Sequence, residues 1–182
     1  MTGTIDKREV QEAIRWMNQE LYSKPITRLR FLIASGGGEI EAGINLHTYL
    51  KALPCEVETI GYGEVDAAAI LVFLAGGTRT AITGCQFFFH EGRYTVIDHT
   101  APIHVHEEAI NVFKRELHEM IYIIARETGN DTETVANMLR KSKIMQASEA
   151  QEFGLCHSIV EKLPLEQQDK GFGFGPKPNR KT

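Results

Sequence analysis

The apolar positions of the chain follow two different periods, and these periods predict its helices and strands. In six segments, apolar residues recur every three to four positions, as on the buried face of a helix. These predicted helices are residues 6–24, 39–53, 65–77, 105–128, 131–142 and 148–155. End signals support several of them, since Asp6 can cap the first, Asp131 or Thr132 the fifth, and Gly129 and Gly154 can terminate the fourth and sixth.

Short apolar runs between these segments predict buried strands. They are residues 29–34, 57–63, 78–83 and 86–92. Because strands and helices alternate in the first half, we expect an α/β fold with a largely parallel sheet and right-handed crossovers. A length of 182 residues fits one domain, which we predict over residues 1–163. The remainder, 164–182, is rich in Gly, Pro and basic residues and is predicted to be disordered or ordered by a partner.

Composition narrows the class of protein. Apolar residues make up 42% of the chain and charged residues 24%, as in ordinary soluble proteins, and the net charge of −4 disfavours nucleic-acid or anionic-membrane binding. No signal peptide and no apolar run of membrane-spanning length is evident, so we expect a cytoplasmic protein. Cys55, Cys85 and Cys156 are too widely spaced for a zinc or redox motif, which favours free thiols in a reducing compartment and predicts no metal or cofactor.

Residues that could carry chemistry cluster at predicted strand ends. Ser35 and the glycines Gly36–Gly38 follow the first strand, a turn ending at Ala67 follows the second, and His90 ends the fourth. The carboxyl ends of parallel strands are where α/β enzymes place functional groups. The glycines fit either a tight turn or a set of N–H donors to a negative oxygen, and no Lys-Ser/Thr follows them as a phosphate loop would require.

Four segments, taken in order, resemble the ClpP-like serine peptidases of the ClpP/crotonase superfamily. They are "LIASGGGEIEAG", "TIGYGEVDAAAILVFLAGG", "FFFHEG" and "ASEAQEFGL". The resemblance covers roughly residues 3–163, and the order and spacing make it specific. It implies repeated ββα units, a mostly parallel sheet and a long protruding handle helix at 105–128.

The resemblance also implies roles for particular residues. The nucleophile position, a serine in the family, falls on Ala67, and the general base falls on His90. The triad acid position falls on Ser142. The backbone N–H groups of Gly38 and Ala68 would form the oxyanion hole.

Substrate binding is implied at Gly36 and Gly37, where Gly36 replaces the family's usual proline. An extended peptide would pair with the strand edge beyond this turn. The missing triad acid leaves Glu91, Asp98 or a group from a neighbouring chain as candidates to orient His90.

Without a hydroxyl at position 67, the chain as given is predicted to be inactive. An engineered Ser-to-Ala change and a naturally non-catalytic subunit both explain Ala67, and the retained His90 and glycine turns favour engineering.

In native form we expect a serine endopeptidase that hydrolyses peptides or unfolded proteins inside an oligomeric ring, for which the family suggests a double heptamer. A crotonase-type acyl-CoA enzyme is a third alternative. An AAA+ unfoldase partner is doubtful, since only "MTGTI" precedes the first helix.

Two other groupings are weaker. His99, His104 and His106 include an H-x-H pair, which can ligate a metal but is more typical of a solvated loop or an interface. Cys156 and His157 are adjacent, so on a strand they would face opposite ways and not form a dyad. Cys85 is expected in the core.

Overall fold

The computed structural model describes residues 1–92 and 100–164. The predicted tail therefore lies outside the described residues, apart from Pro164. Within the described part, six helices and six strands alternate much as the apolar pattern predicts. The helices are α1 Lys7–Ser23, α2 Ile40–Lys51, α3 Ala68–Leu74, α4 Ile103–Thr128, α5 Thr132–Arg140 and α6 Ala147–Phe153. The strands are β1 Arg28–Ser35, β2 Glu56–Asp66, β3 Thr78–Ile82, β4 Gln86–Phe88, β5 Ile144–Gln146 and β6 Ser158–Val160.

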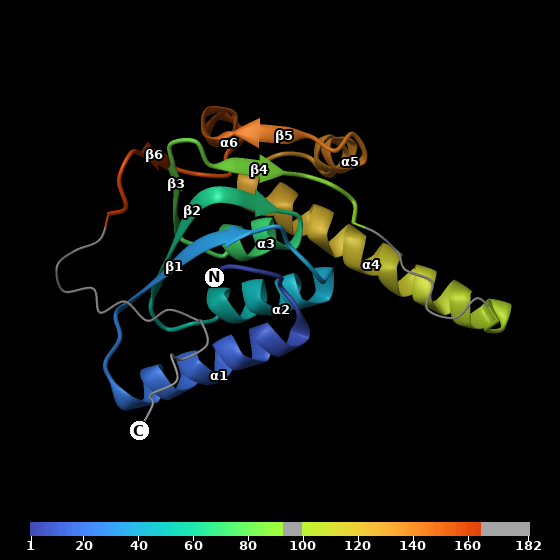
Figure 1. Cartoon of the computed structure of the whole chain (residues 1–182), viewed down its shortest axis with the longest axis horizontal. Coiled ribbons are helices and arrows are strands. Elements are labelled where there is room, and N and C mark those ends of the chain that lie inside the picture. The colour runs from blue at the N-terminus through green and yellow to red at the C-terminus, as the bar shows by residue number, and fades with distance from the viewer. Residues whose placement is uncertain (93–99, 165–182) are drawn as a thin grey trace, which may run out of the picture.

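All six of these strands form one sheet, in which β2 is the central strand (Figure 1). The first half of β2 pairs in parallel with β1 and β3, and its last three residues pair in parallel with β4. β6 extends the sheet in parallel beyond β3, while β5 adds an antiparallel edge beside β4. The expectation of a mostly parallel sheet is confirmed, but the short strands β5 and β6 were not predicted.

The second strand differs from its predicted bounds, and the difference matters for the site. We expected a strand to Gly63 followed by a tight turn, yet β2 continues to Asp66. Its register against β1 shifts, because Ile33 pairs with Gly61 but Ser35 pairs with Val65. Gly63 adopts a φ of 68° inside this bulge, which bends β2 so that its end can pair with β4.

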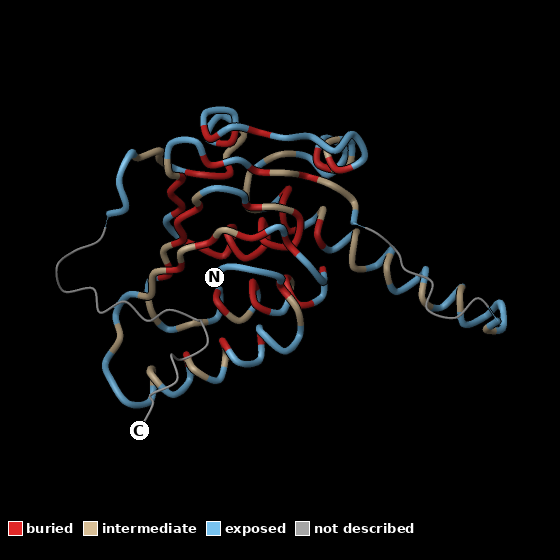
Figure 2. Tube along the Cα trace, viewed as in Figure 1, coloured by how far each residue is buried: buried red, intermediate tan, exposed pale blue. Residues whose placement is uncertain are grey.

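The core lies between the sheet and α3, whose seven residues are all buried (Figure 2). α2 and α4 pack against α3, and α1 packs outside α2. The predicted caps are confirmed, because Asp6 accepts from the Glu9 N–H and Asp131 from the Thr134 N–H, each at 2.8 Å. No helix within 1–92 and 100–164 is long and apolar enough to cross a membrane.

The long helix α4 begins two residues before its predicted start and ends at the predicted Gly129, which is left-handed at φ 74°. Its C-terminal part is buried through Met120, Ile123 and Ile124. Its N-terminal part projects from the body (Figure 1) and leaves Ile103 76% exposed. The expected protruding helix is therefore present.

Candidate active site

The glycine turn after β1 is held by hydrogen bonds from both sides. The buried Ser35 hydroxyl donates to the carbonyl oxygen of Gly3 at 2.5 Å and accepts from the Gly37 N–H at 3.1 Å. Gly37 and Gly38 have φ angles of 86° and 154°, so the predicted need for positive φ is confirmed at these two residues. Gly36 has no such requirement.

Close packing also explains the glycines. A Cβ at Gly37 would lie 2.7 Å from the Asp66 carbonyl oxygen and 3.2 Å from the Ala68 nitrogen. A Cβ at Gly38 would overlap the carbonyl group of Ile5, whereas one at Gly36 would meet nothing within 4 Å. The turn is therefore pressed against the end of β2 and the start of α3.

The N-terminal residues fix the orientation of this turn. The Ile5 N–H donates to the Gly37 carbonyl and the Ile5 carbonyl accepts from the Glu39 N–H, both at 2.8 Å. Because the N–H and C=O of a trans peptide point in opposite directions, the Gly38 N–H points away from Ile5.

Ala67 forms a strained junction between β2 and α3. It has φ 46° and ψ −115° and is 5% exposed. Its N–H donates to the Phe88 carbonyl and its carbonyl accepts from the Ile70 N–H, both at 3.0 Å. A non-glycine residue in such a conformation costs about 1–3 kcal/mol, and a sharp strand-to-helix turn of this kind is how hydrolases present a nucleophile.

His90 lies two residues beyond the end of β4, the strand that pairs with the end of β2. Phe87 and Phe89 are fully buried, so the alternate residues Phe88 and His90 share the opposite face, with ring centroids 4.9 Å apart. The Gly92 N–H donates to His90 Nδ1 at 3.2 Å. A nitrogen that accepts carries no proton, so the neutral ring has its proton on Nε2.

That tautomer is opposite to the one a serine nucleophile needs. In a serine triad, Nδ1–H donates to a carboxylate and Nε2 is left to accept the serine proton. Here Nδ1 accepts a hydrogen bond from the Gly92 N–H, whereas in a triad it would donate one to a carboxylate. Sequence reasoning did not anticipate this hydrogen bond.

Ser142 lies just before the contact between β4 and β5. Phe88 pairs with Ile144 and the Phe89 N–H donates to the Lys143 carbonyl at 2.8 Å, whereas the Ser142 N–H donates to the Leu139 carbonyl at 3.1 Å. Ser142 is exposed and has a left-handed φ of 51°. Of the alternative acids, Glu91 is partly buried beside His90 and Asp98 lies outside the described residues.

Sequence reasoning missed Asp66, the residue before the nucleophile position. Its Oδ1 atom is buried and has no hydrogen-bond partner within residues 1–92 and 100–164. Burial, followed by the charge of Glu64, raises the pKa of the Asp66 carboxyl to about 6, and a hydrogen bond from the Phe88 backbone acts in the opposite direction. The alternation in "GEVDA" places Asp66 and Glu64 on one face, which was the available signal.

The weaker groupings can be followed only in the residues that the structure describes. Cys156 Sγ donates to the Ala147 carbonyl at 3.8 Å, whereas His157 Nδ1 accepts from the Arg79 N–H at 3.1 Å, so the two side chains have separate partners. Cys85 is fully buried, as expected. Among the described residues, no three His, Cys, Asp or Glu side chains are grouped to hold a metal. His99 lies outside that part of the chain.

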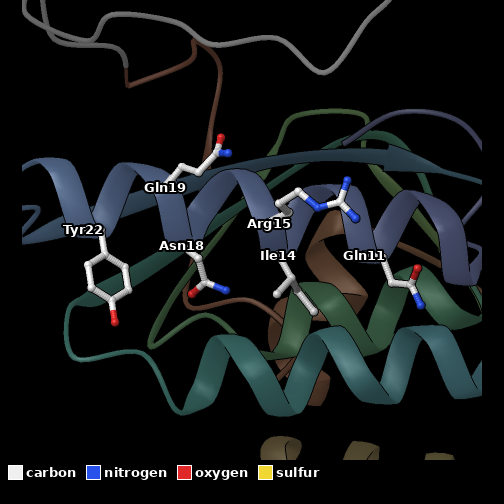
Figure 3. A pocket seen from close by; sticks show the side chains of 6 residues that line it. All are labelled: Gln11, Ile14, Arg15, Asn18, Gln19 and Tyr22. Carbon is white, nitrogen blue, oxygen red and sulfur yellow. The ribbon is translucent and has the colours of Figure 1, made fainter.

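Within the part of the chain that the structure describes, two hollows have the size of ligand sites. One of about 380 Å³ opens beside the glycine turn and includes Gly38 and Gly92 in its lining. The other, of about 560 Å³, lies along the outer face of α1 (Figure 3). All described residues of its lining belong to α1, and none of them is a predicted site residue. Its lining residues are Gln11, Ile14, Arg15, Asn18, Gln19 and Tyr22.

Comparisons with known proteins identify the family of the chain. The sequence model of the Clp protease family matches residues 1–163. The "ATP-dependent Clp protease proteolytic subunit 2" of Treponema pallidum is 31% identical over 169 residues, which is 89% of this chain and 81% of that protein. The protein of the same name from Borreliella burgdorferi is 28% identical over 173 residues, covering 92% and 84%.

A solved structure supports the fold independently. A point mutant of ClpP1 from Listeria monocytogenes superposes with a TM-score of 0.77 at 21% identity, covering 89% of this chain and 90% of that one. The predicted ClpP-like α/β fold is thus confirmed. Because the family match extends over both sides of the site, from the glycine turn to the segment around α6, the chain belongs to the Clp protease family.

Proposed function

We propose that this chain carries the site of a ClpP-type serine endopeptidase for peptides or unfolded proteins, in which Ala67 stands where the active form has serine. The observation that carries the proposal is the strained φ of 46° at Ala67, held against the Gly37–Gly38 turn. A buried alanine has no evident need for that conformation. Relatives named as Clp protease proteolytic subunits support the same activity.

In the proposed reaction, a serine hydroxyl at position 67 attacks the peptide carbonyl and His90 Nε2 accepts its proton. The N–H groups of Gly38 and Ala68 stabilise the oxyanion. The alcohol oxygen bonds to carbon, the amine leaves with a proton from His90, and water then hydrolyses the acyl-enzyme. His90 must first release the Gly92 N–H so that Nδ1 can carry a proton.

The direct test is Ala67→Ser. We expect this variant to be labelled by a fluorophosphonate probe and to cleave fluorogenic peptides, while the parent chain does neither. Ala67→Ser combined with His90→Gln is the matched control, which should lose both signals. If the restored serine is inert toward probe and peptides although the variant is folded, the peptidase proposal is wrong.

A naturally non-catalytic subunit is the second candidate, and the Gly92–His90 hydrogen bond favours it. Ser142 offers a hydroxyl at the acid position, where a carboxylate would draw a proton onto Nδ1, and Nδ1 instead accepts from Gly92. Adding Ser142→Asp to Ala67→Ser separates the two candidates. A large gain in activity would indicate a chain that lost its acid as well as its nucleophile, whereas full activity of Ala67→Ser alone would favour an engineered substitution. Saturable acyl-CoA binding would instead support the crotonase-type alternative.

We also propose that α4 joins copies of the chain into a ring, with the double heptamer as the expected form. The support is its exposed apolar side chains, among them Ile103 at 76% and Tyr122 at 54%. Light scattering that gave a monomer at micromolar concentration would remove this proposal. A cytoplasmic location is a further expectation from the sequence, whereas an AAA+ unfoldase partner, which the family would imply, is not part of the proposal.

A further inference from the structure

The cavity beside the glycine turn adjoins both halves of the proposed site. Gly38 belongs to the predicted oxyanion hole, and Gly92 donates the hydrogen bond to His90. Ile40 and the ring of Phe113 form apolar walls, since a Cβ at Gly92 would lie 3.8 Å from each of them. With a volume of about 380 Å³, the cavity can receive a substrate side chain next to the reacting carbonyl.

The charged groups of this lining are mainly acidic. Among the described residues, Glu39, Glu41 and Glu116 contribute carboxylates to the lining and Lys7 contributes an ammonium. Lys7 Nζ lies 2.8 Å from Glu41 in an exposed ion pair. Glu116 comes from α4, an element separate from the turn residues.

The environment of Glu116 favours an added positive charge. Burial, followed by the negative charge of Glu41, raises the pKa of the Glu116 carboxyl, and the charges of Lys7 and Arg115 oppose this only in part. A cation placed in the cavity would therefore relieve repulsion as well as form a new ion pair.

We infer that this cavity selects a lysine or arginine side chain of the bound peptide, with Glu116 as the specificity-determining residue. The inference rests on the proposed peptidase function, of which it names the substrate class. The aliphatic part of such a side chain packs on Ile40 and Phe113, and its charged end reaches Glu116. An acidic side chain is repelled from the same place.

The first test measures binding to the chain as it stands, because Ala67 prevents cleavage. Fluorescein-labelled alanine pentapeptides carry lysine, uncharged norleucine or glutamate at each position in turn, and affinity is read by fluorescence anisotropy. At one position we expect lysine to bind about fivefold more tightly than norleucine and glutamate to bind most weakly. The preference should weaken in high salt.

Substitutions then test whether Glu116 causes the preference for lysine. Glu116→Gln should bring the lysine-to-norleucine ratio close to one, while Glu119→Gln, an exposed residue of the same helix, should leave it unchanged. Lys7→Gln should increase the ratio, because it removes a competing ammonium. Equal binding of lysine and norleucine in the parent, or a ratio unchanged by Glu116→Gln, overturns the inference.

Cleavage assays separate this inference from the function on which it rests. If Ala67→Ser cleaves peptides without regard to their charge, the inference is overturned and the peptidase proposal stands. If Ala67→Ser cleaves nothing but the binding preference depends on Glu116, the peptidase proposal fails and the cavity remains a site for basic peptides. If Ala67→Ser cleaves peptides next to lysine, and Glu116→Gln abolishes this cleavage, both the peptidase proposal and the inference about the cavity are supported.

Discussion

The partly buried carboxyl of Asp66 should make the stability of the protein depend on pH in a direction opposite to that of most acidic residues. Its folded pKa is raised from 3.8 to about 6. Between these values the folded protein keeps a proton that the unfolded chain releases. The free energy of unfolding therefore falls as the pH rises from about 4 to 6, and the loss is complete near pH 7.

The size of this effect follows from the shift. Two pKa units correspond to about 3 kcal/mol when each unit is worth about 1.4 kcal/mol. Asp66 is only partly buried, and solvent screening reduces this figure, so we expect about 1.5 kcal/mol. Asp66→Asn replaces the carboxyl by a neutral group of the same shape and should recover that amount at neutral pH.

Urea denaturation of the parent and of Asp66→Asn from pH 4 to pH 8 measures the difference directly. We expect the variant to be about equal in stability at pH 4 and about 1.5 kcal/mol more stable at pH 7.5. Asp131→Asn is the contrasting control. Hydrogen bonds from Thr134 lower the Asp131 pKa, so its carboxylate stabilises the protein at neutral pH and that contribution is lost as the pH falls.

A difference between parent and Asp66→Asn that does not change with pH would refute the reasoning. So would a variant that is less stable than the parent at pH 7.5, because it would mean that the ionised carboxylate has a favourable partner. The first result would mean that the Asp66 carboxyl titrates in the folded protein as it does in the unfolded chain, and the second that its ionised form is paired.

Two substitutions elsewhere test the packing around the site. Gly38→Ala should destabilise the protein by about 2 kcal/mol or more, since its Cβ overlaps Ile5, and should speed amide exchange at the N-terminus; Gly36→Ala should be nearly neutral. Arg79→Lys should lower the free energy of unfolding by about 2 kcal/mol, as measured by thermal denaturation. The buried guanidinium donates to three backbone carbonyls at 2.6, 3.1 and 3.1 Å, and an ammonium cannot reach all of them at once. Arg28→Lys, on an exposed edge, should change little.

The fold was predictable where periodicity and end signals agree. The helix ended by Gly129 and the caps at Asp6 and Asp131 combine both kinds of signal, and all were found as expected. The three-residue strands β5 and β6 were missed, because segments so short have no measurable period and depend on pairing with distant partners.

The sequence indicated the positions of the proposed site but not the interactions of its residues. The glycine turn and the resemblance indicated Gly38, Ala67 and His90 from the sequence alone. The hydrogen bond from Gly92 to His90 and the buried Oδ1 of Asp66, unsatisfied within the described part of the chain, depend on how neighbouring strands end, which local sequence does not determine. The bulge at Gly63 has the same origin, since it lets β2 pair with β4.

The attachment of the N-terminal residues to the glycine turn links two parts of the chain that are far apart in sequence. The Met1 nitrogen donates to the Leu32 carbonyl, and four residues later Ile5 binds the turn through both its N–H and its carbonyl. A substitution that displaces this extended segment would therefore also move Gly38. Loss of peptide binding in an N-terminal variant should for this reason be read as a displaced turn before it is read as a missing contact to the peptide.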